Sequence, residues 1–80
     1  MIAEKTKLSD VWLIKPEIVS DFRGDYVMTY NQKLYQDLTG IPLDFVEHDI
    51  STSTKGVLRG IHYSPECWKL NECLIGKLYY

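Results

Sequence analysis

The sequence lacks the features that mark membrane, secreted and nucleic-acid-binding proteins. No apolar run approaches the roughly 20 residues that a membrane-spanning helix requires. The amino-terminal segment from Met1 to Lys7 contains no apolar core of the kind found in signal peptides. The 80 residues carry a formal net charge of −2, so no broad basic surface is expected to attract nucleic acid. We therefore expect a soluble, cytoplasmic protein.

Residues that commonly hold metals or cofactors are also sparse. The two cysteines, Cys67 and Cys73, form no Cys-x-x-Cys pair, and we expect them to be reduced and structural. The two histidines, His48 and His62, form no His-x-His pair, and no zinc-ligand spacing occurs. A phosphate-cradling glycine loop and a nucleophile elbow are both missing. The sequence therefore gives no reason to expect a metal or a cofactor.

The length of the chain limits it to one domain at most. A chain of 80 residues buries a modest fraction of its surface and is marginally stable alone. The last five residues, Gly76 to Tyr80, have the pattern of a turn followed by the opening of an apolar strand. A strand that ends unpaired exposes backbone N–H and C=O groups that can pair with another chain. We therefore expect residues 1–80 to be the N-terminal portion of a single, larger domain.

Short β-prone runs, separated by turn signals, dominate the rest of the pattern. The expected strands are 10–14, 17–19, 26–30, 43–50, 57–63, 68–74 and one that begins at 78. Turns are expected over 20–25, where Gly24 is free to take a positive φ angle, and over 64–66 and 75–77, and a polar loop is expected over 51–56. The expected helix covers 32–38, with Asn31 as its cap and Gly40 at its end. This arrangement predicts a mainly β fold, either a sandwich or a barrel, with one short helix.

Cationic and titratable side chains gather in and just after the stretch Gly56 to Tyr63. Arg59 and His62 lie within it, and Lys69 follows. Such groups are costly to hold near a core unless something anionic is bound. Residues three apart in a regular strand face opposite sides, but a bulge at Gly60 would turn both side chains into one pocket. Without the bulge, His62 could face inward while Arg59 lies at an edge.

These residue types suit proton abstraction beside a carbonyl group. A histidine accepts a proton near neutral pH, and a lysine stabilises the oxyanion that develops. The planar fork of an arginine binds two phosphate oxygens at once. The same residues also have an ordinary interpretation, in which His62 is a hydrogen-bonded structural residue. In that interpretation Arg23 and Arg59 are solvated or form salt bridges with Asp21, Asp25 or Glu47.

Five blocks of the sequence form a recognisable series. They are Asp21-Phe22-Arg23-Gly24-Asp25-Tyr26, Ser51-Thr52-Ser53, Gly56-Val57-Leu58-Arg59-Gly60-Ile61-His62-Tyr63, Lys69-Leu70 and Gly76. In order and spacing, this series resembles the dTDP-4-dehydrorhamnose 3,5-epimerase family along essentially the whole chain. The arginine-glycine-hydrophobic-histidine-aromatic block is the most specific part.

The resemblance implies a cupin-type jelly-roll β-sandwich, considerably longer than this chain and usually a homodimer with strand exchange. The family acts on nucleotide-linked 4-keto-6-deoxy sugars, and we expect a role in surface-polysaccharide biosynthesis. It inverts carbons 3 and 5, both next to the ketone, without a metal or a cofactor.

The resemblance also implies catalytic roles for two residues. His62 matches the general base that removes the proton next to the ketone, and Lys69 matches the lysine that stabilises the enolate oxygen. The tyrosine that returns a proton and the aspartate that orients the histidine would lie beyond Tyr80. We therefore expect the 80-residue chain alone to be inactive and to fold poorly.

Substrate-binding roles follow in the same way. Arg23 and Arg59 match residues that bind the diphosphate. Tyr26 matches an aromatic residue beside the nucleoside, which in this family reaches across from the partner subunit.

The sequence departs from the family near the nucleotide base. Met28 stands where the family usually has a glutamate that touches the base, and Glu47 and Asp49 replace a glutamine and an asparagine. Residues 64–68 also replace the usual glutamine-containing turn. These changes suggest a guanosine- or cytidine-diphosphate sugar, including a heptose, and inversion at carbon 3 alone is also open.

Two other functions remain open on the sequence. One is a non-catalytic jelly-roll module that binds sugar nucleotides or only mediates dimerisation. The other is a cupin ketoisomerase, which moves the keto group between carbons 3 and 4 and also needs a base.

Overall fold

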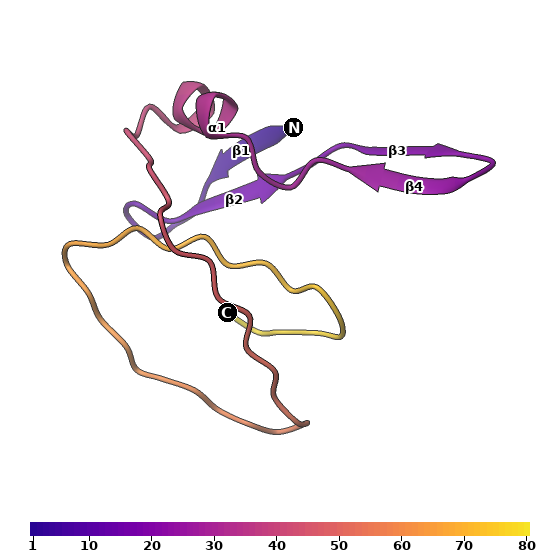
Figure 1. Cartoon of the computed structure of the whole chain (residues 1–80). Coiled ribbons are helices and arrows are strands. Elements are labelled where there is room, and N and C mark those ends of the chain that lie inside the picture. The colour runs from indigo at the N-terminus through magenta and orange to yellow at the C-terminus, as the bar shows by residue number, and fades with distance from the viewer. The chain divides into compact units, whose positions relative to one another are not determined.

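All regular secondary structure lies in the first part of the chain. The computed structural model describes residues 1–80, which divide into two units, Met1–Asp44 and Phe45–Tyr80. The first unit contains strands β1 (Ile2–Lys5), β2 (Trp12–Lys15), β3 (Ile18–Asp21) and β4 (Gly24–Val27), and helix α1 (Gln32–Thr39) (Figure 1). The expectation of a mainly β chain with one short helix is confirmed.

Strands β1 and β2 form an antiparallel hairpin with one partly buried face. Ala3 pairs with Ile14 and Lys5 with Trp12, so these four side chains share a face of the hairpin. Ala3, Trp12 and Ile14 are partly buried there. The Lys5 ammonium lies 5.4 Å from the centre of the Trp12 ring, which is a cation–π distance. Helix α1 contacts β1, so hairpin and helix form one packed group.

Helix α1 begins and ends where the sequence predicts. The Asn31 side chain accepts a hydrogen bond from the Leu34 amide at 2.9 Å and so satisfies one of the free donors of the first turn. Gly40 adopts a left-handed φ of 71°, and its amide donates to the Gln36 carbonyl at 2.8 Å. The helix extends one residue past the expected end, to Thr39.

Removing the Asn31 cap is expected to destabilise the first unit. The change Asn31→Ala deletes the acceptor for the Leu34 amide and should lower the free energy of unfolding by about 1 kcal/mol. Urea denaturation followed by circular dichroism measures the change. Asn71→Ala is the matched control outside the first unit, and an equal loss in both variants would contradict the capping role.

The most buried side chains lie on and just after the helix. Tyr35 is 3% exposed and Leu43 is 6% exposed. The Tyr35 ring meets that of Tyr30 edge-on at 5.0 Å, and its hydroxyl donates to the Thr29 carbonyl. The Gln36 side-chain amide donates to the Leu43 carbonyl at 2.7 Å, which ties the segment after the helix back onto it. This core is small, as the length of the chain predicts.

Strands β3 and β4 form a second hairpin that is separate from the first. Asp21 pairs with Gly24 across a two-residue turn, and Gly24 has the expected positive φ, 123°. The expected turn over 20–25 was too long, because ladder pairing continues through Asp21 and resumes at Gly24. The strand expected over 26–30 lies instead at Gly24–Val27. All eight strand residues are exposed.

The second unit contains neither helix nor strand. The strands expected over 43–50, 57–63 and 68–74, and from 78, were wrong for this structure. A strand requires a neighbouring backbone to pair with its amides and carbonyls, and β propensity alone does not provide one. Turns do occur at Lys55–Gly56 and Pro65–Glu66, within the expected loop and turn.

The strands therefore form two separate two-stranded sheets, ordered β1-β2 and β3-β4. A closed sandwich or barrel is not present within these residues. The structure contains no helix with the length and apolar character needed to cross a membrane.

Candidate functional site

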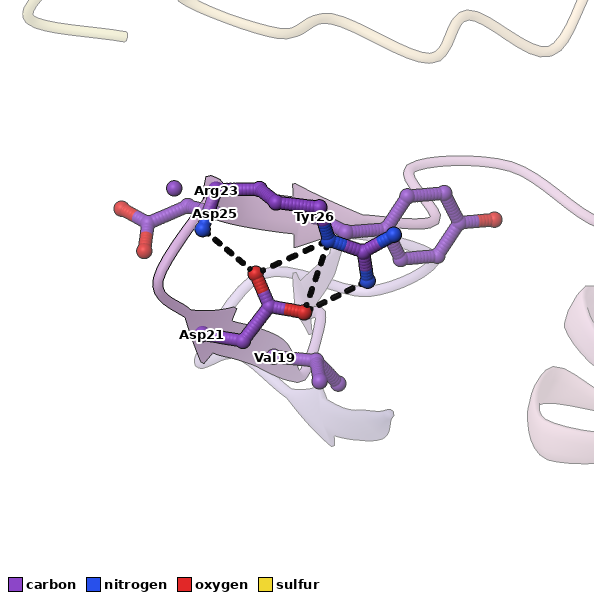
Figure 2. Close-up of a pocket in the computed structure, with 6 residues that line it drawn as sticks. Val19, Asp21, Arg23, Asp25 and Tyr26 are labelled. Carbon is purple, nitrogen blue, oxygen red and sulfur yellow. Dashed lines mark hydrogen bonds and ion pairs between the residues drawn. The ribbon is translucent and has the colours of Figure 1, made fainter.

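Arg23 lies in the turn between β3 and β4 and is paired with Asp21. Its Nη2 lies 2.5 Å from Asp21 Oδ2, and its Nε lies 3.1 Å from the same oxygen. Its backbone amide also donates to Asp21 Oδ1 at 2.8 Å (Figure 2). The tight turn makes this geometry possible, because it brings the arginine back over the carboxylate that ends β3. The salt bridge to Asp21 considered from the sequence is confirmed.

This pairing changes the acidity of both groups. The hydrogen bonds from the Arg23 side chain, and then from its backbone amide, lower the pKa of the Asp21 carboxyl below its ordinary value. The Asp21 carboxylate in turn raises the pKa of Arg23. Both side chains are exposed, so the pair is screened by solvent and contributes little to stability.

Asp21 is therefore expected to titrate at a pH below the ordinary value for aspartate, about 3.9. The pKa of Asp21 is lower in the folded hairpin than in the unfolded chain. The small stabilisation from the pair is therefore fully present when the pH is above the unfolded-state pKa, and it disappears as the pH falls through the folded-state pKa. The carboxyl carbon of Asp21, followed by NMR, measures this. Arg23→Ala should raise the midpoint toward the ordinary value, whereas the control Lys15→Ala should leave it unchanged. An unchanged midpoint in Arg23→Ala would contradict the pairing.

The same hairpin carries a shallow concave surface. Val19 and Tyr26 are ladder partners and share a face with Asp21. These three residues and the turn line the depression shown in Figure 2. Arg23 and Tyr26 therefore border the same depression. Asp25, which also borders it, is hydrogen-bonded to Ser20. Met28 follows β4 and does not line this surface.

Arg59 is held by the polar loop that precedes it. Its Nε donates to the Ser53 hydroxyl at 2.9 Å, and its Nη2 donates to the Thr52 carbonyl at 3.0 Å. Arg59 forms no salt bridge with Glu47 and is exposed, so of the two alternatives in the ordinary interpretation only solvation fits it. Neither Ser53 nor Thr52 was predicted from the sequence as a partner of Arg59. The only available signal was a polar loop within a few residues of the arginine.

The remaining candidate residues of the second unit are exposed. They are Glu47, Asp49, His62 and Lys69. No hydrogen bond joins the His62 imidazole to Arg59, whose side chain bonds to the polar loop instead. Gly60 has a φ of 154° and lies outside any ladder, so the bulge considered as one alternative from the sequence is absent here. No group of three or more His, Cys, Asp or Glu side chains gathers into a metal-binding arrangement.

Comparison with known proteins identifies the group to which these residues belong. The family model described as dTDP-4-dehydrorhamnose 3,5-epimerase matches residues 5–80. The chain belongs to the dTDP-4-dehydrorhamnose 3,5-epimerase family. The resemblance predicted from the sequence blocks is therefore confirmed. No solved structure gives a significant match.

Members of the dTDP-4-dehydrorhamnose 3,5-epimerase family from several organisms are similar to this chain. A protein of that name from Shigella flexneri is 38% identical over 78 residues, which are 94% of this chain and 43% of the relative. One from Pseudomonas aeruginosa is 40% identical over 63 residues, which are 79% of this chain and 35% of the relative. A dTDP-4-dehydrorhamnose 3-epimerase from Streptomyces niveus is 36% identical over 56 residues, 70% of this chain and 27% of the relative. The chain thus spans less than half the length of these relatives.

Proposed function

We propose that this chain is the N-terminal portion of an enzyme that inverts carbon 3, carbon 5 or both in a nucleotide-linked 4-keto-6-deoxy sugar. The observation that carries the proposal is the family match over residues 5–80, which includes His62 and Lys69. The names of the relatives support epimerisation, and that of the Streptomyces niveus protein supports action at a single carbon as an alternative. Surface-polysaccharide biosynthesis is the pathway we expect it to serve.

The active form is proposed to be longer than 80 residues. We use "full-length protein" for this chain extended through the remaining part that its relatives carry. In that protein, residues 1–80 are proposed to form part of one jelly-roll domain, with the second unit paired into its sheets. The exposure of apolar side chains there, such as Val46, Leu58 and Ile61, supports this, because such residues are normally covered.

His62 and Lys69 are proposed to carry out the first half of the reaction. The ketone at carbon 4 acidifies the protons on its neighbouring carbons. His62 takes one of these protons, the C–H electrons form the enolate double bond, and the negative charge moves to the ketone oxygen. The Lys69 ammonium stabilises that oxygen. Reprotonation on the opposite face, by a group outside residues 1–80, inverts the carbon with no net oxidation.

The substrate is proposed to be held through its diphosphate and its nucleoside. Arg23 and Arg59 would bind diphosphate oxygens, and Tyr26 would lie beside the nucleoside. The placement of Arg23 and Tyr26 on one concave surface of the β3–β4 hairpin supports a shared ligand. That hairpin exposes its apolar residues, with Phe22 at the turn 97% exposed, which supports its insertion against a partner subunit in a homodimer.

The nucleotide base is proposed to be contacted by Met28, Glu47 and Asp49. Met28 cannot accept a hydrogen bond as a glutamate can, and this loss weakens the case for thymidine diphosphate. A guanosine or cytidine diphosphate is the base-bearing group proposed instead. Calorimetric titration of the full-length protein with GDP, CDP and dTDP compares the three directly. Tighter binding of dTDP than of the other two would contradict the assignment of the base.

Product identification tests the proposed activity. The full-length protein is incubated with dTDP- and GDP-linked 4-keto-6-deoxy sugars, and the products are identified by proton NMR. The proposal expects a product that differs from its substrate only in configuration at carbon 3 or carbon 5. A keto group moved to carbon 3 would show a ketoisomerase instead, and binding without any product would show a non-catalytic module.

A further inference from the structure

The two candidate phosphate-binding arginines, Arg23 and Arg59, differ in the charge of their hydrogen-bond partners. The Arg23 guanidinium is paired with the Asp21 carboxylate through Nε and Nη2. Arg59 uses the same two nitrogens, but its partners are the neutral Ser53 hydroxyl and the neutral Thr52 carbonyl. Arg59 forms no ion pair. Its orientation is therefore fixed without neutralising its charge.

The bonds to Arg59 leave most of its donors available. A guanidinium carries five N–H donors in a fixed planar fork. Ser53 occupies the one on Nε, and Thr52 occupies one on Nη2, so both donors on Nη1 and one on Nη2 remain. That set is sufficient for a two-point hydrogen bond to a phosphate. Holding the fork in place beforehand also reduces the side-chain entropy that binding would otherwise cost.

We propose that Ser53 is a positioning residue, which orients the Arg59 guanidinium toward the diphosphate of the substrate. The inference rests on the proposed function, because that function supplies the diphosphate. Arg59 contacts the ligand, and Ser53 acts through it. Of the two arginines, Arg23 is already paired with Asp21, so Arg59 is the one whose positive charge is left uncompensated for the phosphate.

Binding of inorganic pyrophosphate to the full-length protein tests this without turnover. Ser53→Ala is expected to weaken pyrophosphate binding about threefold to tenfold, because an unanchored guanidinium loses part of its charged hydrogen bonding. Ser53→Thr keeps a hydroxyl group and should restore most of the affinity. Thr54→Ala is the matched control, since the Thr54 side chain makes no hydrogen bond while its backbone carbonyl accepts from Val57. Kinetically, Ser53→Ala should raise KM and spare kcat.

A double-mutant cycle separates positioning from a general structural role. In an Arg59→Gln background, Ser53→Ala should cause no further loss of pyrophosphate affinity. Loss of affinity in that background, or wild-type affinity in Ser53→Ala alone, would overturn the inference. If Ser53→Ala does not fold, the pyrophosphate affinities of Ser53→Thr and Ser53→Cys are compared instead. Only the threonine keeps a strong acceptor, so Ser53→Thr should bind pyrophosphate more tightly, and equal affinities would overturn the inference.

The outcomes also distinguish this inference from the proposed function. A protein that binds pyrophosphate in a Ser53-dependent way but inverts no carbon contradicts only the epimerase proposal. A protein that epimerises its substrate while Ser53→Ala leaves pyrophosphate binding unchanged contradicts only the role of Ser53.

Discussion

Replacing His62 by asparagine in the full-length protein is expected to slow epimerisation by about a hundredfold to ten-thousandfold, the usual contribution of a positioned general base. Asparagine is polar and similar in size, but its amide does not accept a proton at neutral pH. Substrate affinity should therefore change little, and the loss should appear in kcat. Product formation followed by NMR, with substrate affinity measured separately by calorimetry, gives both quantities.

The other histidine of the chain provides the matched control. His48→Asn makes the same chemical change at an exposed position to which no catalytic role is assigned. It should leave kcat within a factor of two or so of the wild type, since surface substitutions have small effects. Equal losses in His48→Asn and His62→Asn would indicate a structural cause. Full activity in His62→Asn would exclude His62 as the base.

Replacing Lys69 by methionine is expected to lower kcat by about a hundredfold to a thousandfold, the range found when one stabiliser of a developing oxyanion is removed. Methionine keeps the length and apolar stem of the side chain and removes only its charge. The ammonium acts mainly on the enolate, which carries the charge, so KM should change much less than kcat. Steady-state kinetics give kcat and KM for both proteins, with the sugar nucleotide that the NMR product analysis identifies as the substrate.

Lys77→Met is the control for this variant. Lys77 is also an exposed lysine of the second unit, and no role in binding or catalysis is assigned to it. It should behave as the wild type. A Lys69→Met variant that raises KM and keeps kcat would show that Lys69 binds the substrate and does not stabilise the enolate.

Local signals explain what could be predicted from the sequence. Helix α1 was predicted almost to the residue, because its cap, Asn31, and its end, Gly40, act through bonds within a few residues. The positive φ of Gly24 was also predicted, since a tight turn demands it locally. Strand β1 was missed because Glu4 and Lys5 interrupt its short apolar pattern, and its pairing with β2 stabilises it instead.

Features that depend on distant partners could not be predicted in the same way. The runs 57–63 and 68–74 have strong β propensity, but a ladder needs a paired neighbour, and none is present for them. The family was predicted correctly because its blocks are read directly from residue identity and spacing. The partners of Arg59 were missed because a serine loop gives no signal of the side chain that it will anchor.

Solvent deuterium incorporation tests the central proposal most directly. The full-length protein is incubated with its 4-keto sugar nucleotide in D2O, and the sugar is examined by NMR and mass spectrometry. A base that removes a proton next to the ketone predicts deuterium at carbon 3, carbon 5 or both, with incorporation slowed by about a hundredfold or more in His62→Asn. Tight binding of the sugar nucleotide with no deuterium at either carbon would contradict the account.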